Sequence, residues 1–107
     1  MKVLWLDDIR DPVPHGYIGA HWVLTADDCI EALKTKLYHF ASLDHDLSDK
    51  ASMGMPEKNE RTGYTVICWL EENPEYWPEI GVRVHSANPV GNGKMQQVIM
   101  RHYGRNF

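Results

Sequence analysis

Short apolar runs and longer amphipathic segments alternate along the chain. Four of the short runs have the length and composition of strands that are buried in a sheet. The predicted strands are residues 2–6, 22–24, 40–43 and 82–84. Three longer segments repeat apolar residues at helical spacing. The predicted helices follow Thr25, cover residues 64–72 and run from about residue 94 to residue 103.

Local signals mark the ends of these helices. The stretch from Thr25 to Asp28 has the spacing of a capping box, which satisfies free amides at a helix start. The buried face predicted for the helix that follows holds Cys29, Ile30, Leu33 and Leu37. Thr62 is a candidate cap for the second helix. A Gly/Pro/Asn turn over residues 87–93 is predicted before the third helix, and Gly104 ends that helix.

The order of the elements predicts a layered α/β fold with a parallel sheet, because strands alternate with helices along the chain. The first two strands are joined by a segment rich in proline and glycine, residues 9–20, which predicts a loop in place of a helix. Residues 47–61 are polar and predict a second long loop, and loops of that length usually have a function. The length of 107 residues predicts a single domain over residues 1–107.

Composition and charge exclude several classes of protein. The net charge of −4 argues against an extended nucleic-acid surface, which needs clustered lysine and arginine. No apolar stretch approaches the ~20 residues of a membrane span, and the start of the chain lacks the apolar core of a signal peptide. Cys29 and Cys68 lack metal or redox spacing and are predicted to be buried thiols in a reducing cytosol, so we expect a cytoplasmic protein. The oligomeric state stays open.

Polar residues follow three of the predicted strands at the point where each strand ends. These residues are Asp7 and Asp8, then Asp44, His45 and Asp46, and finally His85, Ser86 and Asn88. Parallel strands bring their carboxyl ends to one edge of the sheet, where open α/β sheets bind their ligands. We therefore expect these residues to converge, although some lie far apart in the sequence.

Carboxylates gathered in one cleft repel one another unless a cation neutralises them. Oxygen ligands suit Mg²⁺ or Mn²⁺, which often bridge to phosphate. The expected metal ligands are Asp7, Asp8, Asp44 and Asp46. The histidines leave Zn²⁺ open, but the sequence has no close His/Cys spacing typical of a zinc site.

An anion is the second expected ligand. The stretch NPVGNGK, residues 88–94, places two glycines and a lysine at the start of a helix, where free amides and the helix dipole favour phosphate. It lacks the spacing of a phosphate-binding P-loop. The expected phosphate-binding residues are Arg10, Asn88 and Lys94.

The acid pair in LWLDD, the LDxxL end of the third strand and the serine after the fourth strand resemble the receiver domain of two-component signalling. The resemblance implies a flavodoxin-like sheet of order 2-1-3-4. It also implies that Asp7, Asp8 and Asp44 bind Mg²⁺, that Asp44 accepts a phosphoryl group, and that Ser86 senses it. The helix after the acid pair, the fifth strand and its lysine are missing.

Four motifs are similar to a narrower family: LDDIRDP, SLDHDL, TGYTVICWL and VHSANPVG. They resemble the receiver-like domains proposed to process cyclic phosphates in bacterial and phage contexts linked to RNA repair. This resemblance implies a metal-dependent phosphoesterase that acts on a nucleotide or an RNA end, such as a 2′,3′-cyclic phosphate. We expect His45 and His85 to act as general base and general acid, Ser86 to bind phosphate oxygens, and Asp44 to be a metal ligand or the nucleophile.

Simpler interpretations remain open for each residue. Asp7 and Asp8 fit an ordinary turn, His45 fits a surface histidine, and His85 fits a hydrogen-bonded core residue. Two other functions also remain open: a stand-alone receiver that accepts phosphate on Asp44, and a module that binds a nucleotide without turnover.

Overall fold

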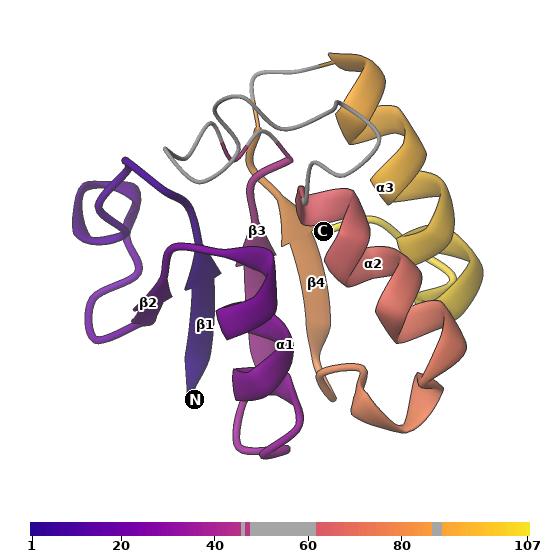
Figure 1. Cartoon of the computed structure of the whole chain (residues 1–107), viewed down its shortest axis with the longest axis horizontal. Helices are drawn as coiled ribbons and strands as arrows, with labels where there is room; N and C mark the ends of the chain where they lie inside the picture. Colours follow the sequence, from indigo (N-terminus) through magenta and orange to yellow (C-terminus); the bar gives the residue numbers. More distant parts are fainter. Residues whose placement is uncertain (46, 48–61, 87–88) are drawn as a thin grey trace.

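A parallel sheet forms the centre of the protein (Figure 1). The computed structural model describes residues 1–45, 47, 62–86 and 89–107. The strands are β1 (Val3–Leu6), β2 (His21–Val23), β3 (Phe40–Leu43) and β4 (Gly81–Val84). They pair in the order β2-β1-β3-β4, and every pair is parallel. The predicted α/β fold, with four parallel strands in the order 2-1-3-4 and three helices, is confirmed.

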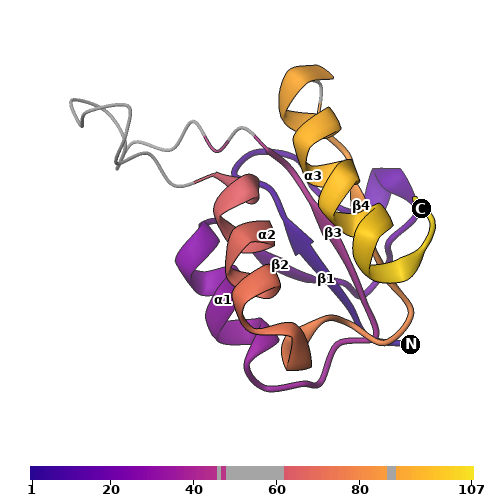
Figure 2. The ribbon, with the colours of Figure 1, turned by 90° about the vertical axis from the view of Figure 1, so that its right-hand side faces the viewer.

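The helices cover the sheet unequally. They are α1 (Ala26–Leu33), α2 (Gly63–Glu72) and α3 (Pro89–Tyr103). Figure 2 shows α1 and α2 on one face of the sheet and the β1–β2 connection on the other, while α3 packs against α2 and β4. The predicted loop over residues 9–20 is confirmed in place of a helix, apart from a 3₁₀ turn, η1 (Val13–His15). A second 3₁₀ turn, η4 (Pro74–Tyr76), follows α2.

The predicted start of α1 is confirmed, but its predicted end is wrong. The Thr25 hydroxyl accepts a hydrogen bond from the amide of Asp28 at 3.1 Å. The helix ends at Leu33 because the chain turns sharply afterwards: the Thr35 hydroxyl donates to the Ala32 carbonyl, and Lys36 adopts a left-handed conformation with φ of 59°. Leu37 therefore lies outside the helix and is 53% exposed.

The predicted turn before α3 is also wrong over residues 89–93, because these residues form the start of the helix. Proline is well suited to the first helical turn, where its missing amide has no partner to lose. The prediction took Pro89 and the two glycines after it for turn residues. The predicted cap of α2 is confirmed: the Thr62 hydroxyl accepts a hydrogen bond from the Tyr64 amide at 3.2 Å, and the Thr65 hydroxyl accepts one from the Thr62 amide at 3.0 Å as part of a capping box.

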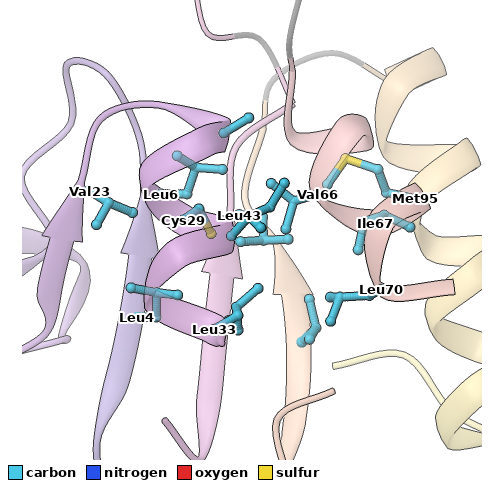
Figure 3. Packing of buried hydrophobic residues seen from close by; sticks show 14 of the residues in the cluster. Leu4, Leu6, Val23, Cys29, Leu33, Leu43, Val66, Ile67, Leu70 and Met95 are labelled. Carbon is cyan, nitrogen blue, oxygen red and sulfur yellow. The ribbon is translucent and has the colours of Figure 1, made fainter. Parts of the chain in front are cut away.

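The main core fills the space between the sheet and the helices (Figure 3). Leu4 and Leu6 of β1 point into it together with Leu43 of β3 and residues from all three helices. Cys29 of α1 is buried there, as predicted, and burial raises the pKa of its thiol. The predicted burial of Cys68 is wrong, because this residue of α2 is only half-buried. No helix within the described ranges is long and apolar enough to cross a membrane.

Sheet register connects this core to the strand ends. Leu6 of β1 pairs with Leu43 of β3, and Leu43 pairs with Val84 of β4. Successive residues of a strand point to opposite faces, so the residue after each member of this row points away from the helices. Those next residues are Asp7, Asp44 and His85.

Two leucines near the end of α1 provide a test of the corrected helix boundary. Leu33 is 2% exposed, and Leu37 is 53% exposed. We expect L33A to lower the free energy of unfolding by about 2–5 kcal/mol, as large-to-small changes in a core do. We expect L37A to change it by less than about 0.5 kcal/mol. Urea unfolding at pH 7 measures both values, and equal losses would show that Leu37 belongs to the core after all.

Candidate functional site

Asp7, Asp44 and His85 form a row across the carboxyl ends of three strands. The backbone ladders continue into this row: the Asp44 amide donates to the Leu6 carbonyl at 2.9 Å, and the His85 amide donates to the Leu43 carbonyl at 3.0 Å. One ligand atom from each of the three side chains lies within 4.8 Å of the other two. Both aspartates are buried, and the His85 side chain is 8% exposed. The predicted convergence is confirmed for these residues.

Asp7 is held by a tight turn that follows β1. Its Oδ1 atom accepts hydrogen bonds from the amides of Ile9 and Arg10, both at 2.9 Å. Its Oδ2 atom accepts from Nε2 of His85 at 3.0 Å and from the Arg10 guanidinium at 3.2 Å. Burial raises the pKa of the Asp7 carboxyl, but the hydrogen bonds from the two amides and from His85 lower it further than burial raises it. Asp7 is therefore a charged carboxylate at neutral pH.

His85 is fixed on three sides. Its Nδ1 atom lies 2.7 Å from the Ser42 hydroxyl, and its Nε2 atom bonds to Asp7. The Trp5 ring stacks on the imidazole with 3.9 Å between ring centroids and 3° between the planes. Burial lowers the pKa of His85 to about 4, although the Asp7 carboxylate opposes this shift. The imidazole is consequently neutral at pH 7, which is the form that binds metals.

Arg10 lies between the two carboxylates. One guanidinium nitrogen is 3.2 Å from Asp7 Oδ2 and 3.3 Å from Asp44 Oδ2. The Trp5 indole donates to the Arg10 carbonyl at 2.8 Å and ties this part of the loop to the sheet. The sequence predicts that Arg10 binds phosphate, and the structure shows that it also offsets the repulsion between the two aspartates.

The donor set fits a divalent cation. Two carboxylates and a neutral imidazole lie close enough to share one ion, and three protein donors leave coordination positions for water or phosphate oxygens. The Arg10 side chain is 35% exposed, so it borders solvent on one side of this cluster.

Two glycines allow α2 and α3 to approach the segment after β3. The Gly63 amide donates to the His45 carbonyl at 3.0 Å, and a Cβ at Gly63 would lie 2.0 Å from the Asp44 carbonyl oxygen. A Cβ at Gly91, in the first turn of α3, would lie 2.4 Å from the His45 ring. The half-buried His45 side chain is thus positioned by the start of α3.

The remaining predicted residues are less closely grouped. Asp8 is half-buried and lies outside the group formed by Asp7, Asp44 and His85. Ser86 is half-buried, and its carbonyl accepts a hydrogen bond from the Asn92 side chain at 2.7 Å. Lys94 is exposed on α3. Asp46 and Asn88 lie outside the described residues.

Ser42 and Trp5 were not identified from the sequence as part of this site. The signal for Ser42 is present in SLDHDL, because strand alternation places Ser42 on the same face of the sheet as Asp44 and places Leu43 on the opposite face. A polar residue at that position of a buried strand needs a hydrogen-bond partner. Its partner, His85, is far away in the sequence and becomes visible only in the folded chain.

The family model of the cyclic-phosphate processing receiver domain matches residues 2–101. The chain belongs to this family. The resemblance noted from its motifs is thereby confirmed. Comparisons with curated proteins and with solved structures gave no match. The matched range of this cyclic-phosphate processing receiver domain includes Asp7, Arg10, Ser42, Asp44 and His85.

Gly91 and Gly93 of this receiver domain form a matched pair in α3. A Cβ at Gly93 would have nothing within 4 Å, whereas one at Gly91 would meet the His45 ring. We expect G93A to raise the free energy of unfolding by about 0.5–1 kcal/mol, because alanine favours a helix over glycine. We expect G91A to lose this gain and to shift the His45 imidazole signals in NMR spectra. Equal gains with unchanged His45 signals would contradict this packing.

The burial of neutral His85 predicts a pH dependence of stability in the metal-free protein. The pKa of His85 is about 4 in the folded state and 6.5 for an unperturbed histidine. Between these values the unfolded chain binds a proton that the folded protein does not bind. The free energy of unfolding should therefore fall as pH falls from 6.5 to 4, by up to about 1.4 kcal/mol per pH unit.

Urea unfolding in EDTA at several pH values measures this slope. H85Q removes the titrating group, so the slope between pH 6.5 and 4.5 should become shallower than in the wild type. Asp7 contributes in a different window, because its lowered pKa adds stability that is lost only as pH falls below its usual value of 3.8. Identical slopes for the two proteins above pH 4.5 would show that His85 is not buried in its neutral form.

Proposed function

We propose that the protein is a metal-dependent phosphoesterase that hydrolyses a cyclic phosphate at the end of a nucleotide or an RNA, such as a 2′,3′-cyclic phosphate. The main support is the row of Asp7, Asp44 and His85, whose ligand atoms lie within 4.8 Å of one another. Membership of the cyclic-phosphate processing family supports the choice of substrate. A setting in RNA repair or processing follows from that substrate.

Asp7, Asp44 and His85 are the proposed ligands of a divalent cation, Mg²⁺ or Mn²⁺. Bound there, the cation would polarise phosphoryl oxygens and offset the charge that develops during hydrolysis. His85 suits the role of ligand better than that of general acid, because the ring is neutral at pH 7 and both of its nitrogens already have partners. Asp8 directly follows Asp7 in the sequence, Asp46 comes two residues after Asp44, and both remain candidate ligands.

His45 is the proposed acid–base residue. During hydrolysis, the oxygen of a water molecule bonds to phosphorus, one P–O bond of the cyclic phosphate breaks, and the freed ribose oxygen takes up a proton. A ring nitrogen of His45 would accept the proton of the water and return it to the ribose oxygen, a role typically worth about 10²–10⁴ in rate. His45 follows Asp44 directly, and its ring is fixed by Gly91.

Arg10 is the proposed main phosphate-binding residue. Its guanidinium already lies at the edge of the carboxylate pair, borders solvent, and has the geometry to bind two phosphate oxygens at once. Ser86, Asn88 and Lys94 are further candidates, since in the sequence they lie just before α3 or within its first turns. Open parallel sheets bind their ligands at the carboxyl ends of the strands. We therefore propose that the substrate binds at that edge of the four-stranded sheet in the described residues.

A receiver-type phosphoacceptor is the second candidate function. Asp44 follows β3 of a sheet in receiver order and lies beside Asp7, as the phosphoaccepting aspartate of a receiver would. In that case the carboxylate of Asp44 would attack the phosphorus of a phosphodonor, the bond between that phosphorus and the donor's leaving group would break, and Asp44 would retain the phosphoryl group. Binding of a nucleotide without turnover is the third candidate function.

Turnover assays separate these functions. We expect the wild type to open 2′,3′-cyclic nucleotides or cyclic-ended RNA in the presence of Mg²⁺, Mn²⁺ or Zn²⁺, and EDTA to abolish the reaction. D44N should lower the rate by roughly 100-fold or more, and H45A by about 10²–10⁴-fold. E31Q, a change at an exposed residue of α1, is the control and should keep full activity.

The other outcomes are equally distinct. A lasting mass increase of one phosphoryl group on Asp44 after incubation with a small phosphodonor, without turnover of cyclic phosphates, would favour the receiver function. Nucleotide binding without product would favour the binding module. Full activity in D44N would remove the proposed metal centre.

A further inference from the structure

Ser42 is a buried polar residue in the middle of β3, and neither the family nor the proposed chemistry gives it a role. It is 0% exposed and lies in the cross-strand row of Trp5 and Arg83, on the face of the sheet opposite α1 and α2. Its hydroxyl is 2.7 Å from Nδ1 of His85. A hydroxyl buried this deeply needs such a partner.

We propose that Ser42 is a positioning residue for His85, and that its hydroxyl bonds Nδ1 in both tautomers of the ring. In one tautomer Nε2 carries a proton toward Asp7, and in the other Nε2 is free to hold a divalent cation. The second half of the proposal, the role of Ser42 in the tautomer that holds a cation, rests on the proposed metal centre. The first half is the hydrogen bond of the metal-free ring. The hydrogen bond between Ser42 and His85 does not depend on it.

The contacts of the metal-free ring define the first tautomer. Nε2 of His85 lies 3.0 Å from Oδ2 of Asp7, and a charged carboxylate can only accept a hydrogen bond. Nε2 must therefore carry the ring proton. Nδ1 is left with a lone pair, so the Ser42 hydroxyl donates to it. The positions of the heavy atoms thus fix which group donates at each end of the ring.

The second tautomer follows from how imidazole binds metals. A histidine that holds a cation through Nε2 uses the lone pair of that atom, so the ring proton must lie on Nδ1. Metal-bound histidines almost always donate this second N–H to a nearby acceptor. The Ser42 hydroxyl can accept it by rotating about its Cβ–Oγ bond, because a hydroxyl both donates and accepts. A backbone carbonyl could serve only this second tautomer, and a backbone amide only the first.

Trp5 explains why the residue at position 42 must also be small. β3 lies between β1 and β4 in the sheet, yet the Trp5 ring of β1 stacks on His85 after β4. The indole therefore reaches across β3 on the face of the sheet where Ser42 lies. Trp5 is itself 0% exposed and is tied to the Arg10 carbonyl, so the stack cannot easily shift. Serine combines a small volume with a hydroxyl, while alanine retains only the small volume.

Metal binding tests the second half of the proposal. We expect S42A to weaken Mn²⁺ binding by about 10–100-fold, the usual effect of removing the partner of a metal-bound histidine. The same change in an H85Q background should have little further effect, because the group that Ser42 positions is gone. S42T, which keeps the hydroxyl, should recover part of the affinity. Calorimetric titration or the EPR signal of free Mn²⁺ measures all of these proteins.

NMR of the metal-free protein tests the first half independently. In ¹⁵N-labelled wild type, long-range ¹H–¹⁵N spectra should show His85 with its proton on Nε2 and with the Nδ1 shift of a hydrogen-bonded acceptor. In S42A the proton should stay on Nε2, and the Nδ1 signal should move toward that of an unbonded nitrogen. With diamagnetic Mg²⁺ or Zn²⁺ bound to the wild type, the ring proton should move to Nδ1.

Each contrary result has a separate meaning. Unchanged Mn²⁺ affinity in S42A, or an equal loss with and without His85, would overturn the positioning role. An unchanged Nδ1 shift in S42A would show that the hydrogen bond is absent. If the wild type binds no divalent cation, the proposed metal centre and the second tautomer fall together, and the Nδ1 shift still decides whether Ser42 orients the ring.

Discussion

The parallel register that pairs Leu6 with Leu43, and Leu43 with Val84, is the constraint on which the rest of the site depends. Side chains alternate between the two faces of a sheet, so a slip of one residue in any strand would exchange a site residue for a core residue. The apolar row packed under α1 and α2 resists such a slip. Hydrophobic packing on one face thus determines which polar atoms meet at the strand ends.

Electrostatic interactions determine whether the buried side chains at the strand ends are stable beside one another. Two buried carboxylates would be costly to bring together, yet Asp7 receives two backbone amides, one imidazole and one guanidinium. Arg10 contributes to both aspartates and is itself placed by the same turn that binds Asp7. Arg10 therefore compensates only part of the negative charge of the two carboxylates, because the His85 imidazole is neutral at pH 7, and a bound cation would compensate the rest.

Much of the fold could be predicted because its signals are local. Short stretches of sequence are enough to predict the strands, the caps at Thr25 and Thr62 and the polar residues at the strand ends. The early end of α1 depends on the local turn at Thr35 and Lys36, whereas other features that the sequence did not predict depend on distant contacts. The glycines at the start of α3 look like turn residues, but one of them is required by the close approach of His45. The dual position of Arg10 and the pairing of Ser42 with His85 join residues that only the folded sheet brings together.

The contact between Gly63 and the Asp44 carbonyl also limits how this scaffold can vary. Any residue with a side chain at position 63 would separate the start of α2 from the strand that carries Asp44, because a backbone oxygen cannot rotate out of the way as a flexible side chain can. A single hydrogen atom is thus the largest substituent that this junction admits. Related sequences that carry another amino acid there would need a different path between strand and helix, and so a different placement of the helix start relative to Asp44.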